Sequence, residues 1–116
     1  MIRCKRIYNQ PDPGDGYRVL VDRLWPRGVA KTEARLDAWL RDIAPSTELR
    51  KWYHQNDDQW DEFAVRYRKE LDRPDACAAL GHLRELAESG TVTLLFSSRN
   101  ETRNNASVLA ELLRES

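Results

Sequence analysis

The chain has 116 residues, of which 41% are hydrophobic, so it is long enough to form one self-standing domain with its own core. Its 19 basic residues are balanced by 19 acidic residues, and this neutrality argues against binding to nucleic acid or membranes through overall charge. No apolar stretch approaches the roughly 20 residues that a membrane span requires, and no signal peptide is evident, so we expect a cytoplasmic protein.

The first two predicted elements are strands. Residues 2–8 alternate as in a half-exposed strand, and the turn-forming sequence NQPDPGDG then ends it. Residues 17–24, YRVLVDRL, are rich in β-branched residues and lack a helical period, which predicts a second, more buried strand. Trp25 and Pro26 end this strand, because proline cannot donate to a strand ladder.

Residues 31–44 fit two different structures. Their apolar residues at positions 36, 39, 40 and 43 fit one face of a helix, whereas positions 37, 39, 41 and 43 fit the alternation of a strand. We favour the helix. Pro45 ends this segment, and Ser46 is expected to cap a short helix that extends through His54.

The remaining elements are three helices and one strand. Residues 57–72 form the clearest helix, capped by Asn56 or Asp57, with an apolar stripe that we expect in the core. A helix from Asp75 to Ser89, a fully buried strand over residues 91–97 and a final helix at about 102–114 follow. This order predicts an α/β fold over residues 1–116, with a small, at least partly parallel sheet flanked by helices in a single layered domain.

The cysteines do not indicate a metal site or a disulfide. Cys4 and Cys77 lie in a predicted strand and a predicted helix, with no CxxC pair and no His/Cys cluster. We therefore expect both to be small buried residues, and the sequence indicates no metal and identifies no cofactor.

Two polar loops follow the carboxyl ends of predicted strands, where ligands of parallel sheets bind. The first, VDRLWPRGV, contains Asp22 and two arginines, and the second, SSRNETRNNA, enters a helix whose free N–H groups and dipole favour an anion. We expect the loops to meet around a small anionic or phosphate-bearing ligand. The candidate ligand-binding residues are Asp22, Arg23, Trp25, Arg27, Ser97, Ser98, Arg99, Asn104 and Asn105.

Structural roles explain the same loops without a ligand. Asp22 is equally explained as half of a salt bridge with a nearby arginine, because an isolated carboxylate in strand-like sequence is costly. In a functional role it would orient an arginine that binds an oxyanion, or act as a general base. In the second loop, Asn100 or Thr102 would serve only to cap the helix. No catalytic triad or nucleophile pair is evident, so the catalytic residues, if the protein is an enzyme, stay unassigned.

A second class of function is a nucleic-acid-binding or regulatory module. Residues 1–31 hold seven basic residues against three acidic ones. Arg3, Lys5, Arg6, Arg18 and Lys31 would contact phosphates, and Trp25 would stack on a base. A domain that only binds a partner protein is the third interpretation.

Four motifs resemble those of the YeaO-like family, domain of unknown function 488, and follow one another over nearly the whole chain. They are DGYRVLVDRLWPRGV, LDAWLRDIAPSTELRKWYH, WDEFAVRYRKEL and TVTLLFSSRNETRNNASVL. The resemblance implies a small α/β domain of a cytoplasmic bacterial protein, and it implies no activity because the family is uncharacterised. The matched motif positions are Asp22, Arg23, Trp25, Pro26, Arg27, Gly28, Pro45, Ser46, Leu49, Arg50, Ser97, Arg99, Asn104 and Ala106.

Two positions depart from the family pattern. Arg99 stands where the family often has lysine, and Asn105 stands where it often has histidine. Asparagine cannot transfer a proton as histidine does, but its side chain still donates hydrogen bonds. The second substitution therefore favours binding or positioning over acid–base catalysis, while the ligand and the oligomeric state stay open.

Overall fold

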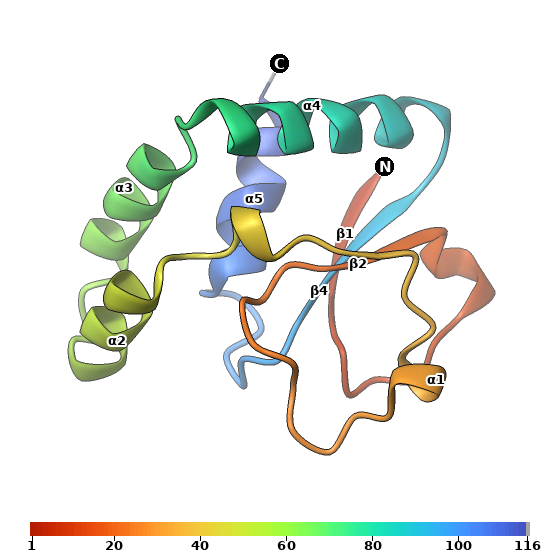
Figure 1. The fold of residues 1–116 in the computed structure, drawn as a ribbon, viewed down its shortest axis with the longest axis horizontal. Coiled ribbons are helices and arrows are strands. Elements are labelled where there is room, and N and C mark those ends of the chain that lie inside the picture. The colour runs from red at the N-terminus through yellow and green to blue at the C-terminus, as the bar shows by residue number, and fades with distance from the viewer. Residues whose placement is uncertain (116) are drawn as a thin grey trace.

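A computed structural model describes residues 1–115, and its centre is a four-stranded sheet in which all pairs are parallel (Figure 1). The strands are β1 (Ile2–Arg6), β2 (Tyr17–Leu20), β3 (Ala38–Trp39) and β4 (Val92–Phe96), in the order β1-β4-β2-β3. The predicted α/β fold with a small parallel sheet is confirmed. Because β2 and β4 are neighbours, their carboxyl ends lie side by side.

Helices cover one face of the sheet, and a long loop covers the other. The helices on this face are α2 (Thr47–Gln55), α3 (Trp60–Glu70), α4 (Pro74–Ser89) and α5 (Asn105–Arg114), whereas the short helix α1 (Lys31–Ala34) lies in the loop on the other face. Two short 3-10 turns, η1 (Pro13–Asp15) and η2 (Arg41–Ile43), complete the elements. On the helix-covered face, Val19, Leu94 and Phe96 pack in the main core with residues of α2 to α5. On the opposite face, Leu20 and Leu95 pack beneath the loop that contains α1.

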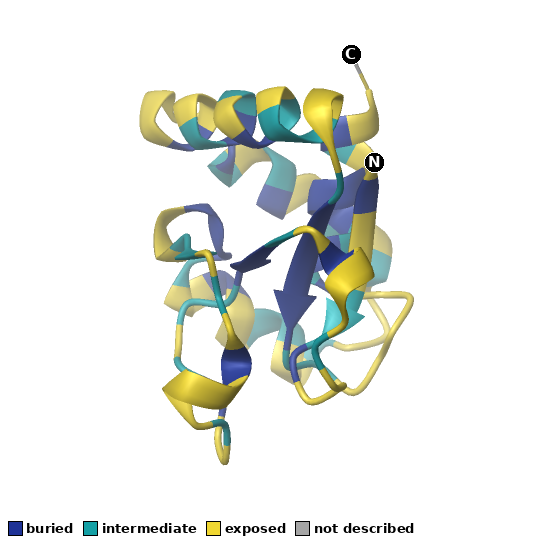
Figure 2. Cartoon of the chain, turned by 90° about the vertical axis from the view of Figure 1, so that its right-hand side faces the viewer, coloured by how far each residue is buried: buried dark blue, intermediate teal, exposed yellow. Residues whose placement is uncertain are grey.

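The apolar patterns of the sequence account for these layers. All five residues of β4 are buried, as expected for a central strand, and Figure 2 shows this strand in dark blue along its length. On α3, Phe63 and Tyr67 are buried and Trp60 is half-buried, so the predicted stripe faces the core. Ser46 caps α2, as predicted, by accepting a hydrogen bond from the Leu49 N–H at 3.1 Å.

The helix favoured for residues 31–44 is wrong. The segment forms α1 of four residues, then β3, then η2. Arg35 ends α1 in the left-handed conformation, with φ of 49°. Asp37 then turns the chain towards β2, because its N–H donates to the Arg18 carbonyl at 2.8 Å and its carboxylate accepts from the Arg18 N–H at 2.8 Å. Pairing with β2 thus overrides the local helical pattern.

Several boundaries differ from the expectation. β2 ends at Leu20 rather than at position 24, α3 begins at Trp60, and α5 begins at Asn105. The start of α5 is set by Asn104, whose side chain accepts from the Ser107 N–H at 2.9 Å. The expected burial of the cysteines is also wrong. Both are exposed, Cys4 on the edge strand β1 and Cys77 on α4.

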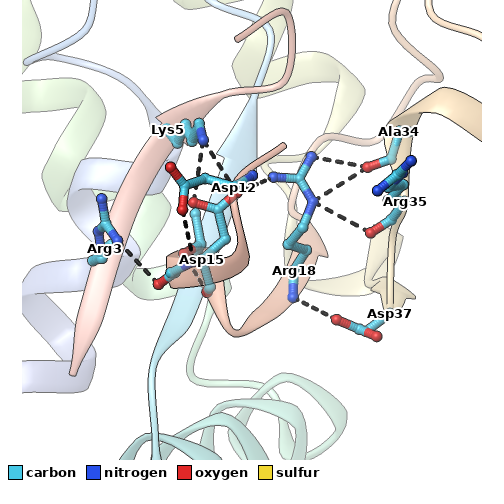
Figure 3. Close-up of polar contacts among 10 residues, drawn as sticks. Arg3, Lys5, Asp12, Asp15, Arg18, Ala34, Arg35 and Asp37 are labelled. Atoms are coloured by element: carbon cyan, nitrogen blue, oxygen red, sulfur yellow. Dashed lines mark hydrogen bonds and ion pairs between the residues drawn. The ribbon is translucent and has the colours of Figure 1, made fainter. Parts of the chain in front are cut away.

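A cluster of buried charges lies at the amino end of β2 (Figure 3). Asp15 is 0% exposed and pairs with Lys5 and with Arg18, which is itself 5% exposed. Arg18 also donates to the carbonyls of Ala34 and Arg35, at 2.8 and 3.2 Å. Burial raises the pKa of Asp15, but the hydrogen bonds from the Asp12 backbone, Lys5 and Arg18 outweigh burial and hold this pKa below its usual value.

Within residues 1–115, no helix has both the length and the apolar character that crossing a membrane requires.

Candidate functional site

The two predicted loops meet where the chain leaves neighbouring strands towards opposite faces of the sheet. The loop after β2 covers the face formed by Leu20 and Leu95, whereas the loop after β4 leads to α5 on the other face. In parallel α/β sheets, ligand sites form at such divergence points. A ligand site is therefore expected at the carboxyl ends of β2 and β4.

The Asp22 carboxylate lies at this point and accepts three hydrogen bonds. One oxygen, Oδ2, accepts from the Ser97 N–H at 2.9 Å and from the Ser97 hydroxyl at 2.7 Å. The other, Oδ1, accepts from the side-chain amide of Asn105 at 3.1 Å, and that amide also donates to the Val21 carbonyl at 2.9 Å. The donors predicted to hold an external anion thus bind a carboxylate of the chain itself.

Asp22 has no charged partner in the part of the chain that the structure describes, where the ion pairs involve other residues. The salt-bridge interpretation of Asp22 is therefore wrong. Its backbone carbonyl accepts from the Trp39 indole N–H at 2.7 Å, which joins the β2 loop to the end of β3. Neutral hydrogen bonds, rather than an arginine, compensate this half-buried carboxylate.

The second loop is held by contacts within the protein. Asn104 is 3% exposed, and its amide N–H donates to the Asn100 carbonyl at 2.8 Å while its oxygen caps α5. Arg6 donates to the Ser98 and Ser97 carbonyls at 2.9 and 3.2 Å. Because the side chain of Asn104 is buried and bonded at both ends, its predicted contact with a ligand would require this cap to open.

Arg23 lies beside a cleft of about 530 Å³ at the carboxyl ends of β2 and β3, which we call the Arg23 cleft. Its Nε donates to the Pro45 carbonyl at 3.0 Å and its Nη2 to the Ala44 carbonyl at 3.3 Å. Arg41, Asp42 and Asp75 supply the other charges of the lining, and its apolar part includes Trp39 and Ile43. The Arg41 guanidinium lies 4.2 Å from the centre of the Trp39 ring.

The other predicted residues lie apart from this cleft. Trp25 packs on the opposite sheet face, edge-on to Trp39 with ring centres 5.3 Å apart, and its indole N–H donates to the Val29 carbonyl. Arg27 and Arg99 are exposed. The Ser98 hydroxyl accepts from the Asn100 N–H within the second loop. The structure therefore joins Asp22 with Ser97 and Asn105 through hydrogen bonds. The next residue, Arg23, is not part of this group and lines the Arg23 cleft.

Sequence reasoning missed Arg41, Asp42 and Asp75. The first two lie in η2, within the segment for which we favoured a helix, and Asp75 lies in the first turn of α4. The signal that could have located Arg41 and Asp42 was the strand-like alternation of residues 37, 39 and 41. A strand at this position pairs with β2, so the residues that follow it lie at the carboxyl end of the sheet.

Tyr67 connects this region to the core. Its hydroxyl donates to the Ile43 carbonyl, next to the cleft, and the side chain is 0% exposed. Burial raises the pKa of Tyr67 well above its usual value, and the negative charges of Asp22 and Glu70 raise it further. The negative charge of Asp22 therefore acts on the buried hydroxyl of Tyr67 in the core as well as on its partners in the loops.

Three of the basic residues predicted to bind nucleic acid, Arg3, Lys5 and Arg18, form contacts within the protein. Arg3 donates to the Gly14 carbonyl at 3.0 Å, Lys5 pairs with Asp15, and Arg18 is buried. Buried Arg18 is not available to a phosphate group, so its predicted role in nucleic-acid binding is wrong. Among residues 1–115, no three His, Cys, Asp or Glu side chains are grouped so that they could hold a metal ion.

Comparisons with known proteins give the family. A family model described as the Inactive DUF488-N3 subclade matches residues 1–116. An uncharacterized protein of Mycobacterium tuberculosis is 47% identical over 112 residues, which cover 97% of this chain and 92% of that protein. The uncharacterized protein YeaO of Escherichia coli is 45% identical over 113 residues, which cover 97% and 96%. No solved structure matches. The chain therefore belongs to the YeaO-like DUF488 family, within the subclade described as inactive.

Proposed function

We propose that this protein is a non-catalytic binding protein, acting in the cytoplasm, that holds a small molecule with an anionic group in the Arg23 cleft. The observation that carries the proposal is the position of Arg23. It lines a cleft of about 530 Å³ beyond the ends of β2 and β3, and this volume is within the usual range for small-molecule sites.

The hydrogen bonds of Arg23 support this role. Two of its nitrogens donate to the Pro45 and Ala44 carbonyls, which fixes the plane of the guanidinium. Its third nitrogen, Nη1, has no hydrogen-bond partner among the described residues. This nitrogen is also accessible to solvent, because it is absent from the buried atoms that lack a partner. A guanidinium that is oriented and still has free N–H groups is suited to an oxyanion.

The hydrogen-bond partners of Asp22 support binding rather than catalysis at this end of the sheet. Among the described residues, the Asp22 carboxylate bonds to Ser97 and Asn105, and neither of these side chains titrates near neutral pH. The description of the family subclade as inactive agrees with this proposal. In it, Asp22, Ser97 and Asn105 position the loop that carries Arg23.

The test is thermal unfolding in phosphate, sulfate or acetate against chloride at matched ionic strength. A ligand with a Kd of ~1 mM, supplied at ~10 mM, adds about 1.4 kcal/mol to the free energy of unfolding. This raises the melting temperature by several degrees in a domain of this size. We expect Arg23→Gln and Arg41→Gln to abolish the shift. Arg99→Gln is the matched control, because Arg99 is an exposed arginine that does not line the cleft.

The proposal fails if neither these anions nor a small carboxylate that also carries an amine raises the melting temperature above the chloride value, or if the shift survives both cleft substitutions. Binding of a short single-stranded DNA, with an affinity that falls steeply with salt, would instead favour the nucleic-acid alternative. A single anion site responds to salt mainly by direct competition, so the salt dependence separates the two functions.

A further inference from the structure

We infer that the ligand of the Arg23 cleft is a zwitterion, with an amine as well as an anionic group, on the basis of the function proposed above. The observation is the balance of charge in the lining. Two arginines, Arg23 and Arg41, and two aspartates, Asp42 and Asp75, line the same cavity.

The two carboxylates are weakly engaged within the protein. The side chain of Asp42 forms none of the ion pairs or hydrogen bonds found among residues 1–115, since only its backbone carbonyl accepts a bond, from Arg73. Asp75 lies 3.8 Å from the Arg73 guanidinium, and these side chains are 62% and 48% exposed. An exposed pair at this distance contributes little, so both carboxylates can bind an ammonium group.

The charges come from different segments of the chain, and apolar side chains share the lining with them. Arg23 follows β2, Arg41 and Asp42 belong to η2, and Asp75 lies in the first turn of α4. Trp39 and Ile43 supply apolar surface in the same lining. A short hydrocarbon chain that carries both an anionic group and an amine offers a partner to each kind of side chain in this lining.

Electrostatics selects against ligands of a single charge. A simple anion that reaches Arg23 also approaches Asp42 and Asp75, which repel it, and a simple amine is repelled by the arginines. A zwitterion pairs with both sets of charges. The cleft should therefore discriminate between molecules of the same length by their charge pattern.

The experiment compares three probes of one chain length, pentanoate, pentylamine and ω-aminopentanoate, by calorimetric titration at neutral pH and low salt. The four-carbon and six-carbon homologues of each probe are included to cover other charge spacings. We expect the best ω-amino acid to bind about tenfold more tightly than its matched carboxylate, and the amine to bind most weakly. Asp42→Asn with Asp75→Asn should reduce this ratio to near one. Asp72→Asn, at an exposed position outside the cleft, should leave it unchanged.

Each other outcome has a definite meaning. If the carboxylates bind and no ω-amino acid binds more tightly, the zwitterion inference is overturned while the proposed function stands. Binding of phosphate or sulfate alone likewise overturns the zwitterion inference and leaves the proposed function in place. If only the amines bind, or if neither these probes nor the inorganic anions bind, both proposals are overturned. A ratio that survives the double substitution at positions 42 and 75 would also exclude the assigned amine contact.

Discussion

At the residue scale, Asp22 connects the segments that meet at the carboxyl end of the sheet. The sequence predicts that donors in the second loop bind an external anion. Two of these predicted donors, Ser97 and Asn105, instead donate to the Asp22 carboxylate. The chain thereby satisfies an anion position internally, and the neighbouring residue, Arg23, faces the adjacent cleft. Asp22 maintains the loop, and the proposed function assigns Arg23 to the ligand.

This arrangement predicts what a histidine would do at position 105. The Asn105 amide is 3.1 Å from the Asp22 carboxylate, so Asn105→His would place an imidazole beside a negative charge. That charge favours the imidazolium and should raise the histidine pKa above its usual value of about 6.5. The raised pKa stabilises the fold at pH values below about 6.5, and this contribution is lost as the pH rises through the higher folded pKa.

The measurement is an NMR titration of the new imidazole. Adding Asp22→Asn to the variant should return its pKa towards the ordinary value, since the negative charge is then absent. Equal pKa values in the single and double variants would mean that position 105 does not place a histidine next to Asp22.

At the scale of elements, helices with clear caps and stripes were predictable from sequence, and short elements fixed by distant partners were not. Ser46 and the stripe through Phe63 and Tyr67 are local signals, and α2 forms as its cap indicates. α3 forms on its stripe, but it begins at Trp60 after Gln59, so the predicted cap at Asn56 or Asp57 is wrong. β3 has two residues and depends on pairing with β2. Its local pattern also fits a helix, so no property of residues 31–44 alone selects the strand.

The same difference applies to the candidate site. The meeting of the Asp22 and Ser97 loops follows from parallel strands, which the sequence indicates. The cleft needs η2 and α4 to approach each other, and this contact joins segments about thirty residues apart in the chain. Arg41 and Asp75 could therefore not be assigned to one cavity without the fold.

The buried tyrosine of α3 gives a prediction at this scale. Tyr67→Phe keeps the ring in the core but leaves the Ile43 carbonyl without its donor, which should cost about 1–3 kcal/mol at neutral pH. Because the folded pKa of Tyr67 is raised, its neutral form stabilises the fold up to the unfolded value of about 10, and this contribution is lost as the pH rises further. Urea unfolding at neutral and alkaline pH measures both effects.

The wild type should therefore lose more stability than Tyr67→Phe above pH ~10. Tyr8→Phe is the matched control, since Tyr8 is 46% exposed and its substitution should leave the alkaline loss unchanged. Parallel alkaline profiles for the wild type and Tyr67→Phe would contradict the assigned burial of the hydroxyl.

At the scale of the whole molecule, the two ends of the sheet have different roles. The carboxyl end carries the cleft and the loops, whereas the amino end of β2 carries the buried charges of Asp15 and Arg18, and Lys5 of β1 pairs with Asp15. Arg18 joins β2 to the α1 region through the Ala34 and Arg35 carbonyls, and Thr93 of β4 donates to the Asp15 carbonyl at 2.7 Å. This network therefore links β1, η1, β2, β4 and the α1 region through residues that do not line the Arg23 cleft.

Removing the Asp15 carboxylate tests this division. Asp15→Asn leaves the buried Arg18 without its negative partner, and breaking a buried pair in this way costs about 3–5 kcal/mol at neutral pH. Since the folded pKa of Asp15 is lowered, its contribution is present above the unfolded value of about 3.9 and is lost as the pH falls through the lower folded pKa. The stability difference between wild type and variant, measured by urea unfolding, should therefore shrink below pH ~4. Asp75→Asn, which removes an exposed ion pair, should cost less than about 1 kcal/mol at every pH. A loss of similar size for the two variants would mean that the buried network does not stabilise the amino end of the sheet.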